Sequence, residues 1–288
     1  MEVFDVFLLE AVLNGILLGG LLALLSLGLN LIFGVIDVVW ICYAEMIMIG
    51  MYAVWLLHAK YAWPLLAAMA AGIALVALLG AALHRFVIRP VLAAEPINQL
   101  LVTGGVLFFL QAAATLAFGI EFRNLGVKMT PLALGEMSFS MPRLIAFAVA
   151  VAGVAGTWLF LSRTYVGTAI RAISQDRQIM PLMGVDANRI FTVTSALGGA
   201  LAGLSGCLLV LQYDIHPAIG LSFGPITFLI CVLGGLGNML GGLIAAFIFA
   251  QFISVGGFFF AIEWGYVIAF LFFIAVMFWR PQGILGGK

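Results

Sequence analysis

The sequence has 288 residues, of which 65% are apolar and 8% are charged, and its formal net charge is zero. A typical soluble domain is about 45–50% apolar and about 25% charged, and a chain of this size cannot bury so large an apolar excess. The composition therefore excludes a soluble globular protein and indicates one that crosses a lipid bilayer. A net charge of zero gives no general attraction to nucleic acid, so we expect no nucleic acid partner.

Long uncharged runs mark the expected elements in chain order. They lie between Glu10 and Asp37 and over 46–59, 61–84, 96–120, 144–162, 190–213, 215–262 and 264–279. A bilayer core of about 30 Å needs about 20 helical residues, so most runs fit one crossing. The run 215–262 is too long for one crossing and is divided at the glycine-rich stretch 234–238.

The fold class that follows is an all-α integral membrane protein with broken helices. It forms a polytopic helical bundle of eight or nine transmembrane segments in a single transmembrane domain over residues 1–288. The count is nine where 46–59 is a full crossing and eight where it is a half-helix. The lipid bilayer is thus the first expected partner of the chain.

Lysine and arginine residues predict the orientation, because cytoplasmic loops of membrane proteins carry an excess of them. With nine crossings, one side holds Arg85, Arg89, Arg163, Arg171, Arg177, Arg189, Arg280 and Lys288. The opposite side holds Lys60, Arg123, Lys128 and Arg143. The larger group predicts a cytoplasmic C-terminus and an N-terminus on the outer side.

Two loops are long enough to have structure of their own. The outer loop 120–143 places proline and glycine around short alternating runs, which predicts a small β-hairpin or an irregular cap. The cytoplasmic loop 163–189 predicts a helix, a turn and a short second helix, with apolar Met180, Leu182 and Met183 among charged residues. Apolar side chains in such a loop favour a surface for a partner protein, and a helix packed under the bundle or lying in the headgroup layer has the same pattern.

Polar groups and glycines inside the apolar runs are the candidates for a substrate path. These are Asn30, Asp37, Glu45, Thr103, Gly234, Gly235, Gly237 and Asn238. An ionisable group at membrane depth is a functional hypothesis by default, and broken helices recur at transport sites. Two plainer interpretations stay open: Asp37 and Glu45 bracket a simple cytoplasmic turn, and the glycines serve ordinary helix packing.

Motifs of soluble and intramembrane enzymes are absent from the sequence. It contains no G-x-x-x-x-G-K-[ST] for binding ATP, no H-E-x-x-H and no G-x-S-x-G. No nucleophile and base stand out as a pair, so we do not expect an enzyme.

Four stretches in family order carry a resemblance. They are Gly28–Ile36 followed by Glu45; Arg89-Pro90 leading to Asn98–Thr103; Thr164–Ala172 continuing to Val185; and Leu233–Asn238 with Arg280–Gly283. The sequence resembles the LivH-like permease subunit of bacterial ABC importers for branched-chain amino acids. The resemblance implies a multi-pass protein of the bacterial inner membrane that imports its substrate by ATP-driven alternating access. The outer side predicted above for the N-terminus would then be the periplasm.

The same resemblance implies the partners. They are a second homologous permease subunit, two cytoplasmic ABC ATPase subunits and a periplasmic substrate-binding protein. This chain would then hold no cofactor, and the ATPase subunits would bind ATP and magnesium. The loop 163–189 becomes the coupling segment that contacts the ATPase, with a cytoplasmic coupling helix and Arg171, Asp176, Arg177, Met180, Leu182, Met183 and Gly184 as its contact residues.

One stretch departs from the family pattern. Relatives carry Asn-Phe-Ala-His-Gly-Glu where this sequence has Trp40–Glu45, so only the final glutamate is retained. Tyr43 joins the predicted substrate path, and the lining there is bulkier and more aromatic than usual. The predicted substrate is a branched-chain amino acid or a related organic acid. The alternatives are urea, short amides or aromatic carboxylates, and a channel or secondary transporter that works without ATPase subunits.

Overall fold

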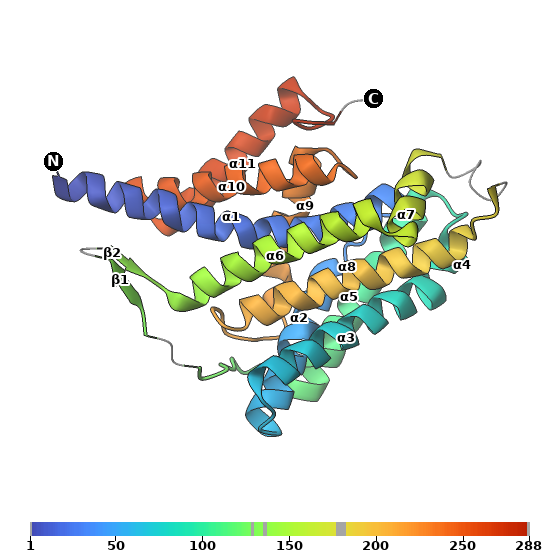
Figure 1. Cartoon of the computed structure of the whole chain (residues 1–288), viewed down its shortest axis with the longest axis horizontal. Coiled ribbons are helices and arrows are strands. Elements are labelled where there is room, and N and C mark those ends of the chain that lie inside the picture. Colours follow the sequence, from blue (N-terminus) through green and yellow to red (C-terminus); the bar gives the residue numbers. More distant parts are fainter. Residues whose placement is uncertain (1, 128–129, 135–136, 177–182, 287–288) are drawn as a thin grey trace.

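The computed structural model describes residues 2–127, 130–134, 137–176 and 183–286. Most of its helices run along one long axis of the molecule, and α7 lies crosswise at one end (Figure 1). The helices are α1 (Glu2–Ile36), α2 (Tyr43–Trp55), α3 (Leu65–Leu83), α4 (Arg89–Val91), α5 (Pro96–Phe118), α6 (Met141–Arg163), α7 (Tyr165–Gln175), α8 (Ala187–Leu209), α9 (Ile219–Gly234), α10 (Met239–Phe259) and α11 (Ile262–Trp279). Two π-helical turns, η1 (Leu56–Lys60) and η2 (His84–Ile88), extend α2 and α3.

Six of the described helices are long and apolar enough to cross a membrane. They are α1, α5, α6, α8, α10 and the continuous helix from α3 through η2 to α4. The helices α9 and α11 are apolar but shorter, and α2 has 13 residues before η1 extends it. The predicted polytopic helical bundle is therefore confirmed, whereas length alone does not give the predicted eight or nine segments.

The helix α1 lies at the centre of the bundle, packed against α6, α8, α9 and α10. Small residues allow neighbouring helices of the bundle, such as α3 and α8, to approach each other closely. Gly80 of α3 faces the backbone of α8 at Ser195, and Gly199 of α8 faces the backbone of α3, so neither position has room for a β-carbon. In contrast, α5 and α6 expose Phe108, Phe109, Leu116 and Trp158, as lipid-facing helices do.

The loop 120–143 contains the predicted hairpin. The strands β1 (Leu132–Leu134) and β2 (Met137–Phe139) pair in antiparallel register, with Leu132 opposite Phe139. Just before them, Arg123 pairs with Ile215 of the loop after α8, and its guanidinium lies 4.4 Å from the centre of the Trp55 ring. The loop therefore ties together the ends of α2, α5 and α8.

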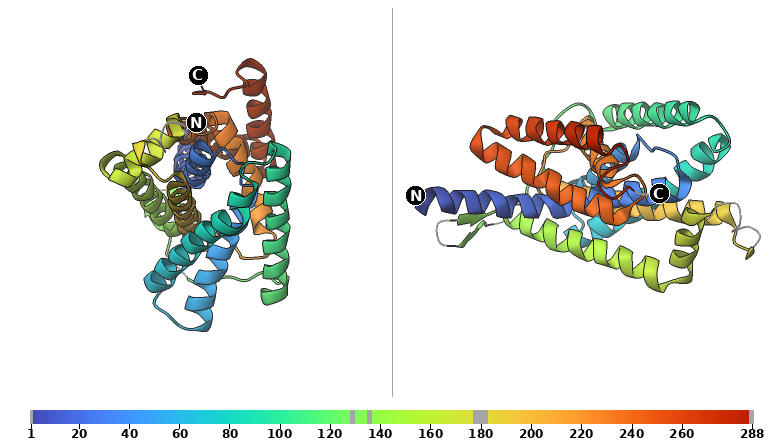
Figure 2. Two further views of the ribbon diagram at one scale, coloured as in Figure 1. Left: turned by 90° about the vertical axis from the view of Figure 1, so that its right-hand side faces the viewer. Right: turned by 90° about the horizontal axis from the view of Figure 1, so that it is seen from above.

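The two ends of the bundle carry different segments. The N-terminus and the hairpin lie at one end, and α4, α7 and the C-terminal segment lie at the other (Figures 1 and 2). The first half of the predicted 163–189 segment is α7, which Thr164 caps by accepting a hydrogen bond from the amide of Gly167. The predicted second helix, with Arg177, Met180 and Leu182, lies outside the described residues.

Candidate functional site

The chain breaks between α1 and α2 and folds back into the bundle. Asp37 has a positive φ of 60°, which ends α1, and residues 37–42 are not helical. The hydroxyl of Tyr43 then lies against Gly28, where a β-carbon would overlap it. Gly28 is eight residues before the end of α1, or about 12 Å at about 1.5 Å per residue. The helix α2 therefore begins inside the bundle.

Two kinds of contact hold this break in place. The Thr103 hydroxyl of α5 donates a hydrogen bond to the Val39 carbonyl at 3.0 Å, and the Tyr43 amide donates to the Trp40 carbonyl at 3.1 Å. The side chains of Trp40, Cys42 and Tyr43 are fully buried, whereas Ile41 is 38% exposed. The break is thus an ordered part of the core.

The helix α9 covers the start of α2. Gly220 lies against the carboxyl group of Glu45, and a β-carbon on Gly220 would come within 2.5 Å of Oε1. Glu45 is fully buried, and among the described residues neither carboxyl oxygen has a hydrogen-bond partner. Pro225 inside α9 cannot donate a backbone hydrogen bond, which weakens the helix one turn beyond this contact. A buried ionisable group thus lies between the start of α2 and a helix that contains a proline.

A groove of about 330 Å³ opens between the break and α9. Its lining is apolar and aromatic and comprises Leu29, Val39, Trp40, Ile41, Tyr43, Ala44, Leu100, Leu107, Gly220, Leu221, Gly224, Pro225, Thr227 and Phe228. A middle cavity of about 580 Å³ shares Leu221 and Pro225 with this groove and adds Asp214 and His216. The surface along α9 therefore changes from polar near the outer loop to apolar beside the break.

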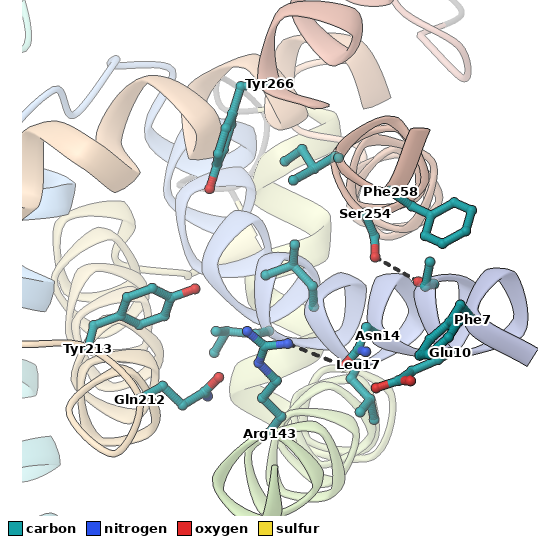
Figure 3. Close-up of a pocket in the computed structure, with 15 residues that line it drawn as sticks. Phe7, Glu10, Asn14, Leu17, Arg143, Gln212, Tyr213, Ser254, Phe258 and Tyr266 are labelled. Carbon is teal, nitrogen blue, oxygen red and sulfur yellow. Dashed lines mark hydrogen bonds between the residues drawn. The ribbon is translucent and has the colours of Figure 1, made fainter. Parts of the chain in front are cut away.

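A third cavity, here called the outer cavity, lies beyond the middle one. It has a volume of about 570 Å³ and shares Tyr213 and Tyr266 with the middle cavity (Figure 3). Arg143 lines it and donates a hydrogen bond to the side chain of Asn14 at 3.2 Å. Burial raises the pKa of Tyr213, and the nearby Arg143 guanidinium opposes that shift. The groove and the two cavities thus form a series from the end of the bundle that carries the N-terminus and the hairpin to the break.

The glycine-rich stretch 234–238 at the end of α9 packs closely against Asn30 and Gly34 of α1, and this contact is here called the glycine joint. Gly235 and Gly237 have positive φ values of 98° and 82°, and Gly237 packs directly on the backbone of Gly34 in α1. The amide of Gly237 donates to the side chain of Asn30 at 3.2 Å. Asn238 caps α10 through the amide of Gly241 at 2.9 Å. Close backbone approach therefore explains why these positions are glycine.

The predicted path residues gather in two places. Tyr43 lines the groove, and Glu45 and Thr103 lie directly behind the break, while Asp37 is exposed at its start. Asn30 belongs with Gly234, Gly235, Gly237 and Asn238 in the glycine joint. None of these five residues lines the groove or the middle and outer cavities. Their role in a substrate path stays a prediction.

Sequence reasoning missed the polar lining of the outer cavity. Glu10 and Arg143 line it from α1 and α6, which are distant in sequence. In the sequence each of them only marks the end of an uncharged run. The one available sign was that Glu10 and Asn14 are four residues apart, which places both on one face of a helix.

The predicted coupling residues that the structure describes lie at the end opposite the hairpin. Arg171 and Asp176 are exposed on and just after α7, and Met183 is 74% exposed. Gly184 has a positive φ of 81° and turns the chain toward α8. The buried face of α7, which includes Ile170 and Ile173, anchors this segment to the bundle.

Comparison with known proteins identifies the family. The family described as "Branched-chain amino acid transport system / permease component" matches residues 11–277. The chain belongs to this family of permeases. The permease is 30% identical to BraD of Pseudomonas aeruginosa, a high-affinity branched-chain amino acid transport system permease protein, over 96% of this chain and 95% of BraD. It is 27% identical to the corresponding LivH of Escherichia coli strain K12, over 97% and 96% of the two chains.

A solved structure shares the fold of this permease. PsaBC from Streptococcus pneumoniae in complex with Fab is 13% identical, with a TM-score of 0.54, over 93% of this chain and 91% of that chain. This likeness concerns the fold alone. Family membership and the six long apolar helices make the permease a multi-pass inner membrane protein, and the family is a transport component rather than an enzyme.

Proposed function

We propose that this permease is one membrane subunit of an ATP-driven importer for branched-chain amino acids. The observation that carries the proposal is the groove where the break between α1 and α2 faces α9, which has Pro225 inside it. Its apolar lining suits an aliphatic side chain, and irregular backbone at membrane depth is tolerated where it is buried in protein or lines a cavity. BraD and LivH are described as branched-chain amino acid permeases, which supports the same substrate.

The partners follow from the same proposal. A second homologous permease completes the membrane unit, two cytoplasmic ATPase subunits bind ATP and magnesium, and a periplasmic binding protein delivers the substrate. The described part of the proposed coupling surface consists of three exposed residues. Arg171 lies on α7, and Asp176 and Met183 follow it. A crosswise amphipathic helix at the end of the bundle suits transmission of ATPase movement to α1 and α8, which it contacts.

A count of nine crossings, which we propose together with an N-terminus on the outer side, is supported by the contacts along α2. Tyr43 lies beside Gly28 inside the bundle, whereas Tyr52 stacks on Phe118 at the outer end of α5, with ring centres 4.2 Å apart. We therefore count residues 37–60 as one crossing, although α2 alone has only 13 residues. The shorter α9 and α11 complete the count.

A second substrate class has a specific observation in its favour. Trp40 and Tyr43 both line the groove, in the stretch that departs from the family pattern. Two aromatic side chains suit a flat aromatic substrate, because ring pairs stack favourably. An aromatic carboxylate is therefore the alternative cargo.

Uptake by the reconstituted complex tests both proposals. The permease, its companion permease, the ATPase subunits and the binding protein are reconstituted in proteoliposomes, and uptake of radiolabelled L-leucine is measured with and without ATP. We expect ATP-dependent uptake that L-isoleucine and L-valine inhibit. ATP-dependent uptake of radiolabelled benzoate without uptake of L-leucine would favour the aromatic cargo. Equal leucine uptake without ATP or ATPase subunits would contradict an ATP-driven importer.

A further inference from the structure

The outer cavity carries two opposite charges that do not pair with each other. Glu10 of α1 and Arg143 of α6 both line it, and no ion pair joins them among the described residues. Figure 3 shows the Glu10 carboxylate and the Arg143 guanidinium on one side of α1, with Asn14 between them. Arg143 uses one guanidinium nitrogen on Asn14, at 3.2 Å. A guanidinium has five N–H donors, so others remain for a ligand.

Further polar groups and an apolar wall complete the cavity. Gln212 and the phenol groups of Tyr213 and Tyr266 also face it (Figure 3). Both tyrosines line the middle cavity as well. Leu21 and Ile253 line it and are almost fully buried. A volume of about 570 Å³ lies within the range of small-molecule sites. One carboxylate, one free guanidinium edge and an apolar wall form the combination that recognises a zwitterion with an apolar side chain.

We propose that the outer cavity binds an α-amino acid as a zwitterion before it reaches the groove. Arg143 binds the carboxylate of the ligand through paired N–H donors, and Glu10 accepts hydrogen bonds from its ammonium group. The side chain of the ligand lies against Leu21 and Ile253. The site rests on the proposed amino acid import, because a substrate without both charges would leave one of the two residues unpaired.

A second source carries the same pair of charges. The headgroup of phosphatidylethanolamine also joins a primary ammonium group to an anion, and the outer cavity lies at one end of the membrane-spanning bundle, near the start of α1 and of α6. The shared chemistry is therefore an ammonium group beside an anionic group. The shared residues Tyr213 and Tyr266 connect the cavity to the middle cavity and thus to α9, which favours the transported amino acid as the source.

The test measures binding of three related ligands to the purified full-length chain in nanodiscs of phosphatidylcholine and phosphatidylglycerol. The ligands are L-leucine, 4-methylpentanoate, which lacks the ammonium group, and 3-methylbutylamine, which lacks the carboxylate. Glu10→Gln should weaken leucine and the amine by about tenfold and leave the acid unchanged. Arg143→Gln should weaken leucine and the acid by a similar factor and leave the amine unchanged, and Arg143→Lys should restore part of the loss.

Matched controls lie on the same two helices. Asp5→Asn removes a carboxylate that is exposed on α1 outside the cavity, and Arg163→Gln removes the cation at the other end of α6. Both should bind all three ligands as the parent chain does. Losses in the Glu10 and Arg143 variants that are the same for all three ligands would overturn the charge assignment.

Native mass spectrometry separates the two sources. It compares phosphatidylethanolamine retained by the parent chain and by Glu10→Gln and Arg143→Gln. Retention that depends on both residues, with unchanged leucine binding, would overturn the amino acid as the ligand. If Glu10→Gln and Arg143→Gln change neither leucine binding nor ATP-dependent leucine uptake, this site alone is overturned. If the parent complex shows no ATP-dependent leucine uptake, the proposed function is contradicted.

Discussion

Thr103 gives a sharp test of how the break between α1 and α2 is held. Its hydroxyl donates to the Val39 carbonyl at 3.0 Å and also lies 3.0 Å from the Leu100 carbonyl of its own helix. Thr103→Val keeps the branched shape but removes the donor. A buried polar group left without its partner costs about 1–3 kcal/mol, so we expect the free energy of unfolding to fall by about 1–2 kcal/mol.

A matched control exists in the same helix. The hydroxyl of Thr115 donates only to the Gln111 carbonyl of α5, at 2.9 Å, so Thr115→Val should cost about 0.5 kcal/mol or less. Chemical unfolding of the purified chain in mixed micelles measures both changes, and ATP-driven uptake measures their consequence. If the lost stabilisation of the break, about 1.4 kcal/mol, appears in full in the activation free energy of transport, the uptake rate changes by about tenfold. Equal stability and equal uptake for the two valine variants would refute the view that Thr103 holds the break.

Three further predictions concern glycines and the coupling surface. Gly220→Ala should lower leucine uptake, because the new methyl group meets the Glu45 carboxyl at 2.5 Å, whereas Gly105→Ala, with nothing within 4 Å, should not. Gly235→Ala should lower the free energy of unfolding by about 1–3 kcal/mol in the same unfolding assay, because φ is 98° there. Arg171→Glu should uncouple ATP hydrolysis from uptake without removing the protein from the membrane. Full uptake with normal stimulation of hydrolysis would mean that the coupling contact lies elsewhere.

The sequence predicted the helices well because lipid forces a long uncharged run for each crossing. Every predicted run corresponds to a helix, including 46–59, which begins three residues earlier at Tyr43. The two breaks predicted at 37–45 and 234–242 each contain a non-helical stretch between helices, at 37–42 and 235–238, and the rest of each predicted range is helical. Glycine, aspartate and the loss of regular pattern mark such places in the sequence, and the turn-forming residues of 120–143 likewise predicted the hairpin.

The sequence did not predict how deep the break lies in the bundle or which helices meet at the outer cavity. Nothing in the local pattern shows that residues 37–42 turn back along α1, because that depends on Gly28 admitting the hydroxyl of Tyr43. The outer cavity depends on α1, α6, α10, α11 and the loop after α8 meeting at one end. A single charged residue at the end of an apolar run carries no sign of which other helix it will face. The sequence therefore did not predict that Glu10 and Arg143 line the same cavity.

The most direct test of the account is thiol labelling at Ile41, which lines the groove and is 38% exposed. The three native cysteines are buried, so Ile41→Cys adds one reactive thiol to the reconstituted complex. Leu101→Cys is the control, because Leu101 is 67% exposed but does not line the groove. We predict that labelling Ile41→Cys stops leucine uptake and is slowed by leucine, with neither effect in the control. Full uptake after complete labelling, at a rate that leucine and ATP do not change, would contradict a substrate path beside the break.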